Sequence, residues 1–185
     1  MKNLTTLLLT TIFIATFGFG QPTMTIATTL EITPEVTTFA GSGSAGSADG
    51  TGTAASFYKP SGVAVDGSGN VYVAEYYNHL IRKITSAGVV TTLAGSGSAG
   101  SANGTGTAAS FYRPNDVAVD GSGNVYVADK SNHLIRKITS AGVVTTLAGS
   151  GSAGSANGTG TAASFRYPWG VAVDGSGNVY VADYY

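Results

Sequence analysis

Carboxylates beside a glycine-rich turn are the first residues in this sequence that could bind a metal. The segment Asp66-Gly67-Ser68-Gly69-Asn70 has oxygen-bearing side chains at alternate positions, as a calcium loop does. A calcium loop of the EF-hand kind also needs a bidentate Glu at a fixed spacing downstream, and none follows. We therefore interpret the segment as a hairpin turn in which Asp66 caps the local backbone.

The two histidines are the next candidates for metal binding or acid–base chemistry. His79 and His133 are the only ones in the chain, and each stands at the start of a predicted strand. A metal site needs several ligands converging on one point, which a single imidazole without neighbouring carboxylates does not supply. We expect both histidines to be structural, with hydrogen bonds between neighbouring strands or units, and we predict no metal and no cofactor.

These features recur because the chain repeats itself. Pro60, Pro114 and Pro168 open three copies of one unit, and residues 60–113 differ from residues 114–167 at only seven positions. A period of this size indicates a repeat architecture. A catalytic site brings together groups with different roles, whereas near-identical units repeat one environment. The sequence therefore predicts a protein that is not an enzyme.

The positions that differ between the copies are the most informative about function. They form two clusters, one just before the first predicted strand of each unit and one at its second turn. In an antiparallel sheet both clusters lie on the same rim, while the turns at 67–69 and 86–88 lie on the other and do not change. The alternative is drift, because loops tolerate substitution.

The changing positions are rich in aromatic, cationic and small polar residues, as adaptable binding surfaces are. We expect this rim to bind a ligand through rigid aromatic anchors. The candidate ligand-binding residues are Tyr58, Lys59, Ser61, Tyr76, Tyr77, Tyr112, Arg113, Asn115, Asp116, Lys130, Ser131, Arg166, Tyr167, Trp169, Tyr184 and Tyr185.

Composition narrows the class of protein and of partner. Charged residues make up 10% of the 185 residues, Gly numbers 27, and there is no Cys. Low charge with many Gly and β-branched residues favours a β-rich, turn-rich protein. The formal net charge of -1 offers no basic surplus for a phosphate backbone, so we expect no nucleic-acid partner.

The N-terminus indicates export. Lys2 precedes an apolar stretch over residues 4–19, and Gly18-Phe19-Gly20 supplies small residues at the spacing of a cleavage site. We interpret residues 1–20 as a secretory signal peptide and residues 21–35 as a leader. An uncleaved membrane anchor is the alternative. We expect a secreted or cell-surface protein without membrane contact after cleavage.

Each unit is expected to form four short antiparallel strands. In the first full copy these are residues 62–66, 71–74, 79–84 and 89–94, separated by turns. Four such strands are the plan of a β-propeller blade, whereas a parallel β-helix would not use three tight turns per unit. The Gly/Ser/Ala-rich stretch between units also recurs, so we predict an ordered crossover that plugs Phe57, Phe111 and Phe165 between neighbouring sheets.

The motifs of each unit resemble the NHL repeat. They are Pro60-x-Gly62-Val63-Ala64-Val65-Asp66, Gly69-Asn70-Val71-Tyr72-Val73-Ala74 and Asn78-His79-Leu80-Ile81-Arg82-Lys83-Ile84, and the Asn-His-Leu triplet recurs at residues 132–134. The resemblance covers about residues 36–185, and the crossover that ends in Phe is similar to NHL arrays of exported bacterial proteins. It implies an all-β β-propeller, commonly of six blades.

The predicted segment is an incomplete ring of about two and a half to three blades. Residues 36–59 hold the last strand of a blade and a crossover, residues 60–113 and 114–167 are blades, and residues 168–185 are a partial blade. Either the sequence is a piece of a longer array or several chains associate, because closure is what removes sheet edges.

The predicted function is a non-catalytic, exported binding module for protein or glycan partners. One alternative is a fragment of a gluconolactonase-like propeller hydrolase or lyase whose catalytic residues lie outside this segment. Another is a structural spacer in a surface array.

Overall fold

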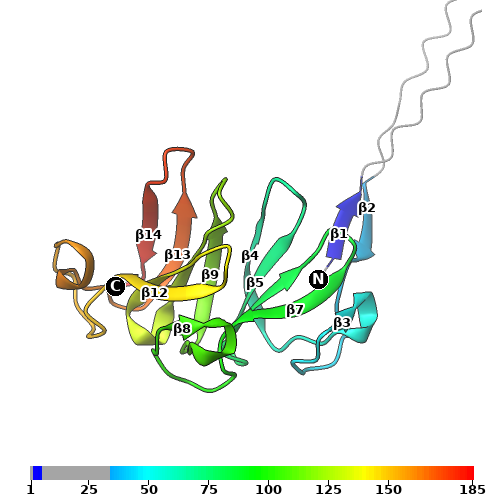
Figure 1. The fold of residues 1–185 in the computed structure, drawn as a ribbon, viewed down its shortest axis with the longest axis horizontal. Helices are drawn as coiled ribbons and strands as arrows, with labels where there is room; N and C mark the ends of the chain where they lie inside the picture. Colours follow the sequence, from blue (N-terminus) through cyan, green and yellow to red (C-terminus); the bar gives the residue numbers. More distant parts are fainter. Residues whose placement is uncertain (1, 6–33) are drawn as a thin grey trace, which may run out of the picture.

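The computed structural model describes residues 2–5 and 34–185. Their regular structure is all-β apart from short 3-10 turns, and every sheet is antiparallel. Figure 1 shows the sheets following one another along a curved row, from the N-terminal pair β1–β2 to the C-terminal pair β13–β14. The row does not close, so the chain forms an incomplete β-propeller, as predicted.

Two complete blades form the middle of the row. The first has the strand order β3-β7-β6-β5-β4 and the second has the order β8-β12-β11-β10-β9. The strands are β3 (Gly50–Thr51), β4 (Pro60–Val65), β5 (Val71–Glu75), β6 (Leu80–Ile84), β7 (Val89–Ala94), β8 (Gly104–Thr105), β9 (Pro114–Val119), β10 (Val125–Asp129), β11 (Leu134–Ile138) and β12 (Val143–Ala148).

The third blade has two strands, β13 (Pro168–Val173) and β14 (Val179–Asp183), which pair with each other. The first strands of successive blades lie together, because β9 packs beside both β4 and β13. The four strands predicted per unit are present in the two complete blades, but their bounds differ slightly. The third strand begins at Leu80 because the backbone φ of His79 is 57°, outside the extended region.

The crossovers are ordered and contain structure that the sequence did not predict. In each full blade the crossover from the previous blade adds a two-residue strand, β3 or β8, to the outer edge of the sheet. A 3-10 turn follows at η1 (Gly52–Ala54), η2 (Gly106–Ala108) and η4 (Gly160–Ala162). The Cβ of any other residue at Gly104 would lie within 3.1 Å of the backbone of residues 108 and 109, so this tight packing requires glycine.

The main core lies between the first two blades. Phe111 is fully buried there, among Ala74 and Ile81 of the first blade and Val127 of the second. Phe57 and Phe165 occupy the corresponding places at the other two blade junctions, where they are half-buried. Burying a Phe side chain contributes about 1.5–3 kcal/mol, so the predicted plugs hold neighbouring sheets together.

An N-terminal strand pair precedes the first blade. β2 (Glu35–Thr38) corresponds in sequence to the start of β7, and β1 (Lys2–Thr5) pairs with it antiparallel. β1 therefore extends the sheet at one edge of β2. The other residues of the predicted signal peptide, and most of the leader, lie outside the described residues, so both assignments stay predictions. Within the described part of the chain, no helix is long and apolar enough to cross a membrane.

Candidate ligand-binding face

The two variable clusters lie against each other in every blade. The backbone N–H of Tyr76 donates to the carbonyl of Lys59 at 3.1 Å, and that of Ser131 donates to the carbonyl of Tyr112 at 3.0 Å. In the third blade the N–H of Arg166 donates to the carboxylate of Asp183 at 2.9 Å. The residues before the first strand and those of the second turn thus form one rim, which we call the variable face.

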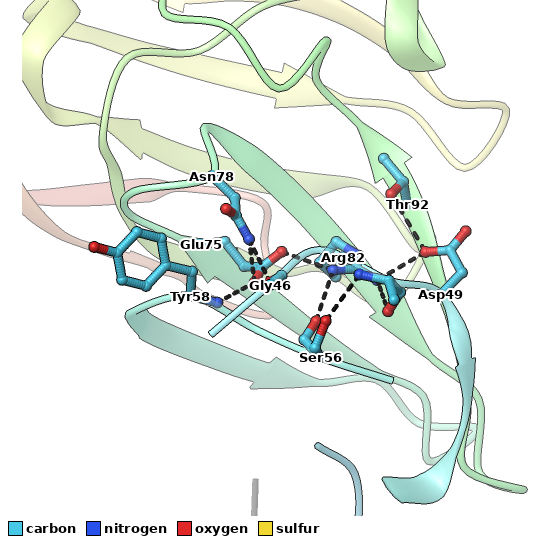
Figure 2. A network of polar contacts seen from close by, with 9 residues as sticks. Gly46, Asp49, Ser56, Tyr58, Glu75, Asn78, Arg82 and Thr92 are labelled. Carbon is cyan, nitrogen blue, oxygen red and sulfur yellow. Dashed lines mark hydrogen bonds and ion pairs between the residues drawn. The ribbon is translucent and has the colours of Figure 1, made fainter. Parts of the chain in front are cut away.

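A buried ion pair supports the variable face from below. Arg82 Nη1 donates to Glu75 Oε2 at 2.8 Å, and both side chains are fully buried (Figure 2). Arg82 Nη2 also reaches Asp49 Oδ1 at 2.7 Å, and Glu75 Oε1 accepts the N–H of Tyr58 at 2.9 Å. The carboxylate therefore ties together the two segments that carry the variable residues.

The second blade repeats this network with two substitutions. Arg136 Nη1 donates to Asp129 Oδ2 at 3.0 Å, and Arg136 Nη2 donates to Asn103 Oδ1 at 2.8 Å. The N–H of Tyr112 donates to Asp129 Oδ1 at 2.8 Å, which orients the variable residues as Glu75 does in the first blade. Burial raises the pKa of the Asp129 carboxyl to about 6, against the opposing effect of these donors.

The network was missed in the sequence, although a signal was present. Position 75 is one of the seven positions that differ between the first two copies, but Glu75 and its equivalents Asp129 and Asp183 are all acidic. Arg82 lies two residues from both Leu80 and Ile84, so these three side chains share one buried face of the strand. An arginine among apolar residues, with an acidic residue at the end of the preceding strand in both complete blades, indicates a buried ion pair.

Each residue of the Asn-His-Leu triplet has a structural role, as expected for the histidines. Asn78 Nδ2 donates to Glu75 Oε1 at 3.0 Å and to the crossover carbonyl of Gly46 at 2.8 Å. His79 Nδ1 accepts the N–H of Arg113, in the next blade, at 3.0 Å. Leu80 is buried. Burial first, and then the nearby Arg113 cation, lowers the pKa of His79.

Backbone strain occurs at one variable position in all three blades. Lys59, Arg113 and Tyr167 have φ values of 50°, 55° and 61°, and each precedes the proline that begins a blade. Non-glycine residues seldom adopt positive φ, and such strain costs about 1–3 kcal/mol at each site. The fold holds these side chains on the variable face in spite of that cost.

Aromatic rings and cations form a continuous line across the three blades. We call it the aromatic–cationic track: Tyr58, Tyr77, Tyr76, Lys130, Trp169, Tyr184 and Tyr185. Ring centroids of successive aromatic residues are 4.6–5.2 Å apart. Lys130 Nζ lies 5.3 Å from the ring of Tyr76 and 4.1 Å from that of Trp169, so one lysine joins the first and third blades.

Much of the track is accessible to a ligand. In the first complete blade Tyr58 is 43% exposed and Tyr77 is 38% exposed. Other cations lie over rings beside it: Lys59 is 4.9 Å from the centroid of Tyr77, and Arg113 is 5.7 Å from that of Tyr76. Arg166 lies over Tyr185 at 5.0 Å, and Tyr167 lies 6.3 Å from the same ring. Most candidate residues therefore belong to one surface.

Three candidate residues instead bridge neighbouring blades. Ser61 Oγ lies 3.4 Å from the carbonyl of Pro114, and Asn115 Nδ2 donates to the carbonyl of Trp169 at 2.7 Å. Asp116 Oδ2 accepts the N–H of Val171 at 3.0 Å. Asn115 is only 8% exposed, so its contact with a ligand would require movement. All three side chains thus form hydrogen bonds between the first strands of adjacent blades.

The opposite rim is built from turns that are the same in every blade. Asp66 Oδ1 accepts the N–H groups of Ser68 and Asn70, both at 2.9 Å, and its Oδ2 accepts Asn70 Nδ2 at 2.8 Å. The side-chain bond from Asn70 is the main reason why the pKa of Asp66 is lowered. This geometry confirms the interpretation of the segment as a capped hairpin turn.

A hollow of about 610 Å³ lies beside the first blade's end of the variable face. Its wall includes Gly43 and Ser44 of the first crossover, together with Tyr58 and Lys59. Two variable residues thus border a recess as well as the exposed track.

Comparison with known proteins identifies the repeated unit. The sequence matches the NHL repeat at residues 57–84, 111–138 and 165–185. NHL repeat-containing protein 2 of Bos taurus is 38% identical over 95 residues, which are 49% of this chain and 13% of that protein. The chain spans 9% and 13% of the length of the curated relatives that it matches.

Two solved structures support the fold. An auxiliary nutrient binding protein from Bacteroides ovatus is 25% identical, with a TM-score of 0.54 over 62% of this chain and 32% of that chain. An auxiliary nutrient binding protein from Bacteroides thetaiotaomicron is 21% identical, with a TM-score of 0.61 over 83% of this chain and 38% of that one. At this level of identity the second likeness supports the fold alone.

Proposed function

The chain belongs to the NHL-repeat β-propeller proteins, and we propose that this segment is a non-catalytic binding module for a protein or glycan partner. The aromatic–cationic track carries the proposal, because it runs unbroken across three blades and remains accessible. Aromatic anchors bury large areas at low cost in conformational entropy, and so dominate many binding surfaces. We further propose that the chain is exported and works in a secreted or cell-surface setting.

Two further observations favour binding over loop drift. The two residues that precede the proline of each blade are always one tyrosine and one cation, although their order is reversed in the third: Tyr58-Lys59, Tyr112-Arg113 and Arg166-Tyr167. Drift would not keep this composition while exchanging positions. The Bacteroides ovatus structure, by its description, is a nutrient-binding protein, and a binding role on a similar fold accords with the proposal.

The test compares the variable face with the constant rim. We would measure retention of the full chain on immobilised glycans and on an array of extracellular proteins. The variant Y76A/Y77A/W169A should lose retention, whereas a control with exposed turn serines replaced, S68A/S86A/S140A, should keep it. Equal retention by both variants would reject the binding face and favour a spacer in a surface array.

A further inference from the structure

We propose that the variable face takes an acidic glycan, a polysaccharide whose sugars bear carboxylate or sulfate groups. This rests on the proposed binding function and names the chemical class of its ligand. The first observation is the distribution of charge. Four cations lie on the variable face, Lys59, Arg113, Lys130 and Arg166, and each lies over an aromatic ring.

Two of the four carboxylates near this face are paired with arginines within the protein. Glu75 and Asp129 are buried and paired with Arg82 and Arg136. Asp116 and Asp183 accept backbone N–H groups, from Val171 and Arg166, but form no ion pair within the described residues. Four surface cations therefore outnumber these two carboxylates. The four surface cations form no ion pair within the described residues, since every pair there involves Arg82 or Arg136. The face therefore offers positive charge to an outside partner, although the whole chain has a net charge of -1.

The second observation is the alternation of rings and cations. In the track Lys130 stands between Tyr76 and Trp169, and Arg113 lies over both Tyr76 and Tyr112. An acidic sugar has an apolar face of C–H groups, which packs on an aromatic ring, and an anionic group at its edge, which pairs with a cation. A polymer of such sugars presents these groups repeatedly along its length, so it can contact the rings and cations of successive blades.

The strained residues support the same ligand. Two of the cations, Lys59 and Arg113, are held at positive φ, and Tyr167 occupies the equivalent position in the third blade. Strained backbone often occurs at ligand-binding sites, where the surrounding structure holds it in place. The strain here fixes one cation or ring per blade on the variable face before a ligand arrives.

The experiment measures retention of the full chain on immobilised acidic polysaccharides, namely polygalacturonate, alginate, hyaluronan and chondroitin sulfate. Dextran, galactan and xylan serve as neutral counterparts, and poly(U) tests for nucleic acid. We expect retention on at least one acidic polysaccharide and on none of the others. Retention should weaken as salt increases, because exposed charges are screened.

Two lysines provide matched variants. K130A should weaken retention about fivefold or more, from loss of an ion pair and of the contacts with two rings. K83A removes a lysine that also lies over a tyrosine, 5.7 Å from the ring of Tyr72, but near the constant rim, and should leave retention unchanged. Circular dichroism would verify that both variants are folded.

Three results would overturn the inference: retention on no acidic polysaccharide, equal retention on neutral ones, or retention on poly(U) with the same dependence on Lys130. The chain could instead be retained on neutral glycans or on a protein, with that retention lost in Y76A/Y77A/W169A. This result would overturn the acidic-glycan inference but support the proposed binding module. Absence of any partner dependent on the variable face would reject both.

Discussion

Individual buried polar residues explain why the variable face can change while the blade does not. Glu75 and Asp129 each accept a backbone N–H from the segment that precedes the first strand, and each also pairs with a buried arginine. The neighbouring residues, Tyr76 or Lys130, are only half-buried and differ between the blades. The buried carboxylate stabilises the blade, whereas the residue next to it can change and so alter which ligand the face binds.

Replacing one member of the buried pair should be far more damaging than replacing its exposed neighbour. Glu75→Gln leaves the guanidinium of Arg82 buried without its main counter-ion, so the free energy of unfolding should fall by about 3–5 kcal/mol. Asp49→Asn should change it by less than about 1 kcal/mol, because Asp49 is 54% exposed and Asn103 already makes the same contact with Arg136. Urea unfolding of both variants measures the difference, and similar losses would contradict this account.

Single elements show which features could be predicted from sequence. The strands were predictable because Val, Ile and Tyr alternate between glycine-rich turns, as in Val71–Glu75. The strand at Gly50–Thr51 could not be, since it pairs through backbone atoms alone and its residues are typical of loops. Arg82 was overlooked because a charged residue within a strand is ordinarily taken to face solvent.

The crossover phenylalanines provide a test at the scale of the blade junction. Phe111→Ala should reduce the free energy of unfolding by about 3–5 kcal/mol, because the ring is fully buried between two blades. Phe57→Ala should cost clearly less, since Phe57 is half-buried at the first junction. Calorimetric unfolding of the two variants gives the comparison, and a larger loss for Phe57→Ala would show that the junctions are wrongly assigned.

The contact between neighbouring blades should weaken in acid. His79 Nδ1 must be neutral to accept the N–H of Arg113, and the folded-state pKa of His79 is lowered from 6.5. The unfolded state therefore binds this proton more readily, so the stability from the contact is complete above about pH 6.5 and is lost as pH falls through the folded-state pKa. Nuclear magnetic resonance titration should give His79 a pKa below 6.5 and move the Arg113 amide resonance with it; a pKa above 6.5 would contradict the contact.

At the scale of the whole molecule, the two rims of the propeller differ in kind. The constant rim repeats the same capped turn at Asp66, Asp120 and Asp174. The variable face presents a different set of rings and cations on each blade, yet these join into one track. The sequence could locate the two rims because the copies are so alike, but it could not show that Lys130 links Tyr76 to Trp169, which are 93 residues apart.

Amide hydrogen exchange of the full chain, alone and with the acidic polysaccharide that retains it best, tests the central claim most directly. The account predicts protection at residues 75–77 and 129–131, which lie on the variable face, and little change at the constant turns 67–69 and 86–88. Protection centred on the constant turns, or spread equally over both rims, would contradict it.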